Sequence, residues 1–284
     1  MGIFSDVLLV SDYDDTMTEP GGLPGKDGKI AKMTTVPQAN LDAIRAFEEE
    51  GGLFTIASGR TQIYYDNVIR KTIIPSAPLI LANGSHIYDP VKDQDILVRP
   101  LPDSVVALAK DAIARFPEVA LQAQRKDNMC ILHCAEKDKE YYLNLPYHVL
   151  GDADSYPQPW VKLHFSGPHE HIAQLMEYLQ AHYHEYEYAE SVPTVCEMQS
   201  LGVTKGDAAR WLAKRLGRKI LVCVGDAPND LPMLEEADYA FVTESGFDVM
   251  REMGFFRAAE ARKGAVADVI RQMRTLLKKQ SRNR

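Results

Sequence analysis

The sequence predicts an α/β fold, in which a doubly wound parallel sheet carries an inserted α+β domain. Short, continuously apolar segments alternate with amphipathic segments toward both ends of the chain, and the middle of the chain lacks this pattern. The alternation is typical of buried parallel strands that are covered by helices on both faces. The 284 residues also exceed the usual domain length of about 100–150 residues, so a second unit is expected.

The segments of the first part predict three strands and two helices. Each apolar run ends in small or polar residues, and apolar residues recur every three or four positions in the predicted helices. The predicted strands span residues 7–10, 53–57 and 79–82, and the predicted helices span 38–49 and 62–71. After the middle of the chain the alternation returns, with strands at 220–224 and 239–242 and helices at 205–216, 229–235 and 265–277.

The middle of the chain predicts a different kind of unit. Polar and apolar residues alternate along its predicted strands, as in a sheet with one face open to solvent or to a cleft. These strands lie at 95–101, 119–125, 129–135 and 160–167, and helices are predicted at 103–116 and 169–183. We therefore predict a core of residues 1–84 and 196–284, and an inserted α+β domain of residues 85–195.

Composition narrows the class of protein. There are 32 lysines and arginines against 40 aspartates and glutamates, and this net charge of −8 argues against nucleic-acid binding as the main activity. No signal peptide is evident, and no apolar run approaches the ~18 residues that a membrane span needs, so we expect a cytoplasmic protein without a membrane partner. The four cysteines are scattered, and we expect them to be buried and reduced.

Acidic residues follow the first predicted strand, and a Ser-Gly pair follows the second. Asp12 and Asp14 come directly after the first strand, and Ser58 and Gly59 come after the second. The carboxyl ends of parallel strands are where α/β folds build their sites, and free N–H groups at a helix start can bind a phosphate. Taken alone, the acids are better explained by a polar turn, and the Ser-Gly pair is a common helix start.

Two later segments carry charged residues at similar places. Lys205 lies in the first turn of a predicted helix, where a positive charge opposes the helix dipole, so it is better explained by a bound anion than by helix stability. A solvated surface lysine is the alternative. Asp226, Asn229 and Asp230 follow the strand predicted at 220–224. Because carboxylates that converge from different strands repel one another unless a cation lies among them, this donor set suits Mg²⁺.

Taken together, the four segments resemble the four motifs of the haloacid dehalogenase superfamily. In chain order, the matching residues are DYDDT at 12–16 for the DxDxT motif, Ser58 for motif II, Lys205 for motif III, and Gly225-Asp226 with Asn229-Asp230 for motif IV. A large insertion after the third strand, preceded by the sequence LANGSHIY, further resembles subclass IIB with its C2-type cap. That subclass includes Cof-like and sucrose-phosphatase-like hydrolases, and it implies a Rossmann-like core with the inserted domain as its cap.

Three features depart from the usual motifs without removing a reactive group. Asp15 replaces the more usual glycine after the second acid, and Ala227 and Pro228 fill the variable pair of motif IV. A loop at residues 19–35, rich in glycine, proline and lysine, is longer than in most relatives and could reach the substrate entrance.

The resemblance implies a role for each motif residue. Asp12 is implied as the nucleophile that forms an aspartyl-phosphate, and Asp14 as the general acid and base. The implied Mg²⁺ ligands are Asp12, the main-chain carbonyl of Asp14, and Asp226. Asp230 and Asn229 are implied to order waters or the lysine around the metal site. The residues implied to bind the phosphate are Asp12, Ser58, Gly59, Lys205 and Asn229.

The implied function is that of a Mg²⁺-dependent phosphatase acting on a small phosphate ester, with sugar phosphates as the class suggested by this type of cap. A phosphomutase of the phosphomannomutase type is the nearest alternative, and a non-catalytic metabolite-binding protein is a more distant one. The presence of Asp14 favours a phosphatase over a dehalogenase. We expect a monomer or a weak homodimer. In the cap, Arg125, Lys162 and His164 are candidates for substrate contact, although a solvated sheet face explains each of them equally well.

Overall fold

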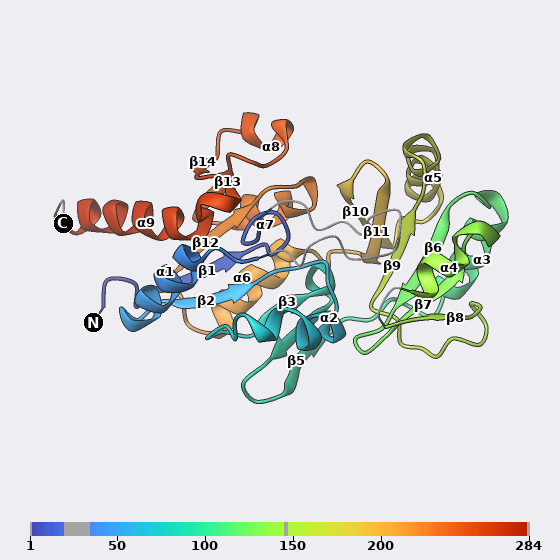
Figure 1. The fold of residues 1–284 in the computed structure, drawn as a ribbon, viewed down its shortest axis with the longest axis horizontal. Helices are drawn as coiled ribbons and strands as arrows, with labels where there is room; N and C mark the ends of the chain where they lie inside the picture. Colours follow the sequence, from blue (N-terminus) through green and yellow to red (C-terminus); the bar gives the residue numbers. More distant parts are fainter. Residues whose placement is uncertain (1, 20–34, 145–146, 283–284) are drawn as a thin grey trace.

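The core of the protein is a five-stranded parallel sheet with the strand order β14-β13-β12-β1-β2 (Figure 1). The structure is a computed structural model that describes residues 2–19, 35–144 and 147–282. The strands of this sheet are β1 (Val7–Ser11), β2 (Leu53–Ile56), β12 (Ile220–Gly225), β13 (Tyr239–Thr243) and β14 (Phe256–Ala258). β1 lies inside the sheet, between a strand from its own end of the chain and a strand from the other end.

Helices cover both faces of this sheet because successive strand residues point to opposite faces. The helices are α1 (Gln38–Glu49), α2 (Gln62–Asn67), α6 (Lys205–Arg215), α7 (Leu231–Glu236), α8 (Asp248–Glu252) and α9 (Ala265–Arg282). Leu9 and Phe54 belong to an apolar cluster with residues of α1 and α9, whereas Leu8 and Leu221 belong to a second cluster with residues of α6 and α7. The doubly wound parallel sheet that the sequence predicts is therefore confirmed.

A small antiparallel sheet continues from the edge of the core. Its strands are β3 (Leu79–Leu81), β4 (His86–Asp89) and β5 (Gln94–Val98). A single parallel bridge between Ala57 and Ile80 joins it to the end of β2. The sequence does not predict β4, because this short strand directly follows a tight turn in which Ala82 and Asn83 both have positive φ.

The middle of the chain forms a six-stranded sheet with the order β10-β11-β9-β6-β7-β8, beside the core (Figure 1). All neighbouring pairs are antiparallel except β7 and β8. Its strands are β6 (Ala120–Gln124), β7 (Met129–His133), β8 (His148–Leu150), β9 (Lys162–Ser166), β10 (Tyr186–Val192) and β11 (Val195–Ser200). Its helices are α3 (Val105–Arg115), α4 (Lys139–Leu143) and α5 (His169–His182). The last strand of this sheet, β11, ends at Ser200, beyond residue 195, where the sequence predicts the end of the inserted domain.

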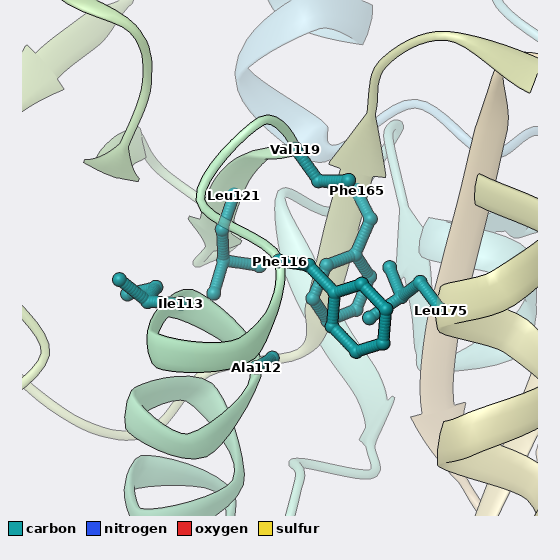
Figure 2. Close-up of a pocket in the computed structure, with 7 residues that line it drawn as sticks. All are labelled: Ala112, Ile113, Phe116, Val119, Leu121, Phe165 and Leu175. Atoms are coloured by element: carbon teal, nitrogen blue, oxygen red, sulfur yellow. The ribbon is translucent and has the colours of Figure 1, made fainter. Parts of the chain in front are cut away.

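The two faces of this sheet differ in polarity. One face packs against α3 and α5, and Figure 2 shows Phe116, Phe165 and Leu175 meeting there. All seven side chains around this point are apolar, which makes it a hydrophobic core rather than a binding site. The opposite face carries the intervening polar residues of the same strands, which include Gln122, Gln124, Lys162, His164 and Glu197.

Several predicted elements differ in extent from the observed ones. The helix predicted at 62–71 ends at Asn67 and continues as a 3₁₀ turn at Ile69–Lys71. The helix predicted at 229–235 begins as a 3₁₀ turn at Pro228–Asp230 before α7. The closing helix, predicted at 265–277, runs to residue 282. Residues 20–34 of the long loop lie outside the described residues.

Two further observations bear on the sequence analysis. All four cysteines are buried and free, as predicted. Among the residues that the structure describes, no helix is both long enough and apolar enough to cross a membrane.

We predict that Gly206→Ala destabilises the protein. Gly206 lies at the start of α6, where an added Cβ would fall 2.1 Å from the main-chain oxygen of Pro232 in α7. Because backbone cannot move aside as a side-chain tip can, the free energy of unfolding should fall by about 1–3 kcal/mol. Urea denaturation measures this change. Gly167→Ala is the matched control, since an added Cβ there would lie 3.5 Å from its nearest neighbours and the variant should be nearly neutral. Equal stability of both variants would contradict the proposed close approach of the two helices.

Candidate active site

The carboxyl ends of β1 and β12 bring two predicted site residues together. Ser11 pairs with Val224 in the parallel register, so the chain leaves both strands at the same edge of the sheet. The N–H of Asp12 then donates to the carbonyl oxygen of Val224 at 2.9 Å. Asp12 and Asp226 are each only 6% exposed. The register of the two strands therefore places these carboxylates side by side at the edge where α/β folds build their sites.

Lys205 joins two of the acidic segments. The Thr204 hydroxyl caps α6 by accepting a hydrogen bond from the N–H of Asp207, which fixes the start of the helix. From the first turn, the buried ammonium group of Lys205 donates to Asp12 Oδ1 and to Asp230 Oδ1, both at 2.6 Å. Because this ammonium is buried between two carboxylates, the alternative of a solvated surface lysine is wrong, whereas the predicted binding of an anion stays a prediction.

Asp230 organises the loop after β12. Its side chain is fully buried, and its Oδ2 accepts hydrogen bonds from the N–H groups of Asp226 at 2.9 Å and Ala227 at 3.2 Å. A Cβ at Gly225 would lie 2.6 Å from this carboxylate, so glycine is needed for the close approach. The Thr16 hydroxyl donates to Asp226 Oδ1 at 2.5 Å and so orients Asp226, the other acid of this loop.

These carboxylates carry more negative charge than Lys205 balances. Oxygen atoms of Asp12, Asp226 and Asp230 lie within 4.8 Å of one another, close enough to bind one metal ion. Burial and repulsion from Asp230 raise the pKa of Asp12 well above its ordinary value and raise the pKa of Asp226 to about 8. Burial opposes the charge of Lys205, but Asp12 and Asp230 raise its pKa, so the ammonium stays charged. The set of donors therefore fits a divalent cation.

Asp14 lies outside this group of three acids and points to a more open place. Its side chain is 37% exposed and pairs with Arg60, whose Nε lies 3.1 Å from Asp14 Oδ2. The guanidinium of Arg60 also lies 4.5 Å from the ring centre of Tyr64. Arg60 is not among the functional residues that the sequence predicts. Its place directly after Ser58-Gly59, at the sheet edge that also carries Asp14, could have suggested the pairing.

Asp15 shows why the motif usually has glycine after the second acid. Its φ is 60°, in the left-handed region that glycine adopts freely and aspartate tolerates better than most residues. Its N–H donates to the Thr18 hydroxyl at 3.1 Å. The departure from the motif is thus compatible with the same turn.

Ser58 and Gly59 form a turn at the end of β2, beside a turn from β3. The N–H of Ser58 donates to the carbonyl of Ile80 at 2.8 Å, and its hydroxyl accepts from the N–H of Arg60 at 3.1 Å. A Cβ at Gly59 would approach Asn83 Oδ1 to 3.1 Å, so the glycine leaves room for the neighbouring turn. The predicted phosphate-binding roles of Ser58 and Gly59 stay predictions.

Asn229 is half-buried and lies beside a small cavity. The cavity has a volume of about 30 Å³ and is also lined by Lys205, Thr204 and Gln199. It thus lies between the start of α6, the loop after β12 and the six-stranded sheet. The supporting roles predicted for Asn229 stay predictions.

The polar face of the six-stranded sheet contacts the motif II turn directly. Lys162 is 2% exposed, and its ammonium donates to the carbonyl of Gly59 at 2.7 Å and to Glu197. The amide of Asn83 donates to Glu197 Oε2 at 2.8 Å, and His164 Nδ1 lies 3.5 Å from Glu197 Oε1. Although burial opposes ionisation, Lys162 and His164 hold the pKa of Glu197 well below its ordinary value. Asn83 and Glu197, which sequence reasoning missed, carry this contact.

Of the three cap residues that the sequence singled out, Arg125 lies elsewhere. Its Nε pairs with Asp127 at 3.1 Å, and Nη1 donates to the carbonyl oxygens of Pro157 at 3.2 Å and Gln158 at 3.4 Å. These bonds hold a loop within its own unit. Lys162 and His164, in contrast, lie at the contact with the core.

A family model described as haloacid dehalogenase-like hydrolase matches residues 9–270. The chain belongs to this family. The match includes all four motifs that the structure brings to one edge of the sheet, from Asp12 to Asp230.

Individual relatives agree with this assignment. An HMP-PP phosphatase from Serratia proteamaculans is 30% identical over 254 residues, which cover 87% of this chain and 86% of the relative. A 5-amino-6-(5-phospho-D-ribitylamino)uracil phosphatase from Bacillus subtilis is 24% identical over 239 residues, or 83% of this chain and 88% of the relative. A solved structure described as a sugar phosphatase of subclass IIB of the superfamily shares the fold, with a TM-score of 0.72 at 16% identity, covering 93% of this chain and 98% of that chain. The predicted family, fold class and enzyme class are therefore confirmed.

We predict that Asp226→Asn stabilises the metal-free protein at pH 8 but has little effect near pH 4. A carboxyl with a raised pKa keeps its proton in the folded protein at pH values where the unfolded chain has lost it. The contribution of Asp226 to the free energy of unfolding is therefore most favourable at low pH, and it is lost as the pH rises from 3.8, the ordinary pKa, to about 8. The gain at pH 8 should exceed about 1 kcal/mol, because one unit of pKa shift corresponds to about 1.4 kcal/mol.

Urea denaturation in the presence of a chelator, at both pH values, measures this difference. A gain that is equal at pH 4 and pH 8 would show that charge repulsion at Asp226 is not its cause.

Proposed function

We propose that this protein is a Mg²⁺-dependent phosphatase that hydrolyses a small phosphorylated metabolite, such as a sugar phosphate, through an aspartyl-phosphate. The observation that carries the proposal is the buried contact of Lys205 with Asp12, at 2.6 Å, inside a group of three carboxylates. A nucleophilic carboxylate, a fixed cation and a metal-binding set of oxygens are together what phosphoryl transfer requires. The phosphatase names of the relatives support the same class of reaction.

The residues that would hold Mg²⁺ are Asp12, Asp226 and the main-chain carbonyl of Asp14, with Asp230 and Asn229 ordering waters or the lysine. The donor chemistry supports this proposal, because three buried carboxylates face one ammonium group and two of them have raised pKa values. When bound, the ion would supply the positive charge that lets an anionic substrate approach an anionic nucleophile.

The chain's own residues would then carry out two displacements. A carboxylate oxygen of Asp12 attacks the phosphorus, the bond to the ester oxygen breaks, and Asp14 gives that oxygen a proton. Asp14 next takes a proton from a water that attacks the phosphorus, and the bond to Asp12 breaks to release inorganic phosphate. The Ser58 hydroxyl and the Lys205 ammonium would bind the phosphoryl oxygens through both steps. Arg60 restrains the Asp14 side chain through its ion pair.

The six-stranded sheet with its helices would act as the cap. The bonds from Lys162 to the Gly59 carbonyl and from Asn83 to Glu197 hold this sheet against the motif II turn. A cap held there would exclude bulk water from the phosphoryl-transfer site.

We predict that Asp12→Asn abolishes turnover, because an amide cannot serve as the nucleophile. The rate of p-nitrophenyl phosphate hydrolysis should fall by more than about a thousandfold, while the protein stays folded. Asp6→Asn is a matched control at the amino end of the same strand, where the side chain is 53% exposed, and it should keep full activity. Release of inorganic phosphate by the wild type separates hydrolysis from a mutase reaction. Activity retained by Asp12→Asn would overturn the proposal.

We also predict that Mg²⁺ binding weakens as the pH falls. Because the pKa of Asp226 is about 8, the ion must displace a proton from this site below that pH. The affinity should fall by up to about tenfold per pH unit if one proton is released. Calorimetry between pH 6 and pH 8, in buffers with different ionisation enthalpies, measures both effects. Affinity that does not change with pH would contradict the proposed ligand set.

A further inference from the structure

The polar face of the six-stranded sheet brings buried side chains close to the motif II turn. Lys162, Glu197 and Gln199 are 2%, 5% and 1% exposed, respectively. Lys162 donates to the carbonyl of Gly59, which directly follows Ser58. A group attached to a phosphate at this turn would therefore meet the same side chains.

Asn83 is held in place by its own turn. Its backbone has φ 55° and ψ 29°, and its N–H donates to the Ser58 carbonyl at 3.1 Å. Its Nδ2 donates to Glu197 Oε2 at 2.8 Å and to Gln199 Oε1 at 3.4 Å. These two acceptors fix the orientation of the amide. Within the part of the chain that the structure describes, no group donates a hydrogen bond to the buried Asn83 Oδ1, so this acceptor beside the motif II turn is available to a ligand.

The cavity next to Lys205 is where the first atoms of a leaving group could lie. Its lining includes Asn83, Gln199, Lys205 and Asn229. Its volume of about 30 Å³ has room for water but not for a sugar, so a larger group requires the contacts of the cap to move apart. The same contacts, from Asn83 to Glu197 and Gln199, are those that a substrate would exchange for its own.

The charged side chains around this space carry more negative than positive charge. Glu197 and Lys162 balance each other's charge, while Glu187, which also lines the cavity, accepts a hydrogen bond from the N–H of Gly202 at 3.2 Å. Lys205 is already shared between two carboxylates. A second negative charge on the substrate would therefore meet carboxylates in a place with little water to screen them.

We propose that Asn83, Glu197 and Gln199 are specificity-determining residues that receive the leaving group of the phosphate ester, favour leaving groups with hydroxyl donors, and reject those with a second negative charge. This inference rests on the proposed phosphatase function. Hydroxyl groups would donate to Asn83 Oδ1 and to the carboxylate of Glu197, both of which accept hydrogen bonds.

Two substrates that differ in one group test the inference. Glycerol 3-phosphate ends in a hydroxymethyl group where 3-phosphoglycerate has a carboxylate, and p-nitrophenyl phosphate reports the chemistry without either group. We expect kcat/KM for glycerol 3-phosphate to exceed that for 3-phosphoglycerate by at least about tenfold in the wild type. Glu197→Gln should narrow this ratio severalfold, mainly through faster reaction of 3-phosphoglycerate.

Asn83→Gly provides a second variant, because glycine keeps the left-handed turn and Lys162 keeps its partner. It should lower kcat/KM for glycerol 3-phosphate relative to p-nitrophenyl phosphate by severalfold. Glu190→Gln is the matched control. Glu190 pairs with Cys196, the neighbour of Glu197 in β11, so its side chain lies on the opposite face of the same hairpin. Glu190→Gln should leave both ratios unchanged.

The outcomes separate the two proposals. Hydrolysis of p-nitrophenyl phosphate, with no preference between the other two esters or with ratios unchanged in both variants, would overturn the specificity residues and leave the phosphatase function standing. No hydrolysis of any of the three esters would overturn both.

Discussion

The site depends on one buried ammonium group that lies between two carboxylates. Lys205 ties the end of β1 to the loop after β12, and the helix that carries it is fixed by its Thr204 cap and by the glycine contact with α7. Through its other oxygen, Asp230 holds the N–H groups of that loop. The ion pairs of Lys205 thus hold the strand, the helix and the loop together. Removing the lysine would leave buried acids without a compensating charge.

The surplus of negative charge is a cost to folding and, under the proposed function, a condition for activity. Three carboxylates around one ammonium repel one another, as the raised pKa values of Asp12 and Asp226 indicate. The free energy of unfolding would be greater if the site had one acid fewer. The proposed binding of a cation and an anionic substrate would be a physical reason to keep all three, in line with the usual conflict between stability and activity.

The sequence predicted the centre of the site because local patterns locate it. An apolar run followed at once by acids marks the end of a buried strand, and parallel pairing then brings Asp12 and Asp226 together. The contact between Asn83 and Glu197 has no such mark, since it depends on how one sheet docks on another turn, 114 residues away in the chain. The sequence does not predict the β10–β11 hairpin, for a local reason: acidic and half-buried positions interrupt β10, where strands usually carry apolar or β-branched residues. For Arg125, the sequence suggested a polar face but not the loop carbonyls that bind it.

The position of β1 inside the parallel sheet has a consequence for the order of folding. Its partner β12 and the buried lysine come late in the chain, and Lys205 is 193 residues from Asp12. Closing so long a loop costs entropy before any contact repays it, so local units form more readily than the central pairing. During synthesis, the antiparallel unit in the middle can assemble while β1 still waits for its neighbour. The group of Asp12, Asp226 and Asp230 can therefore form only after Asp230 has left the ribosome.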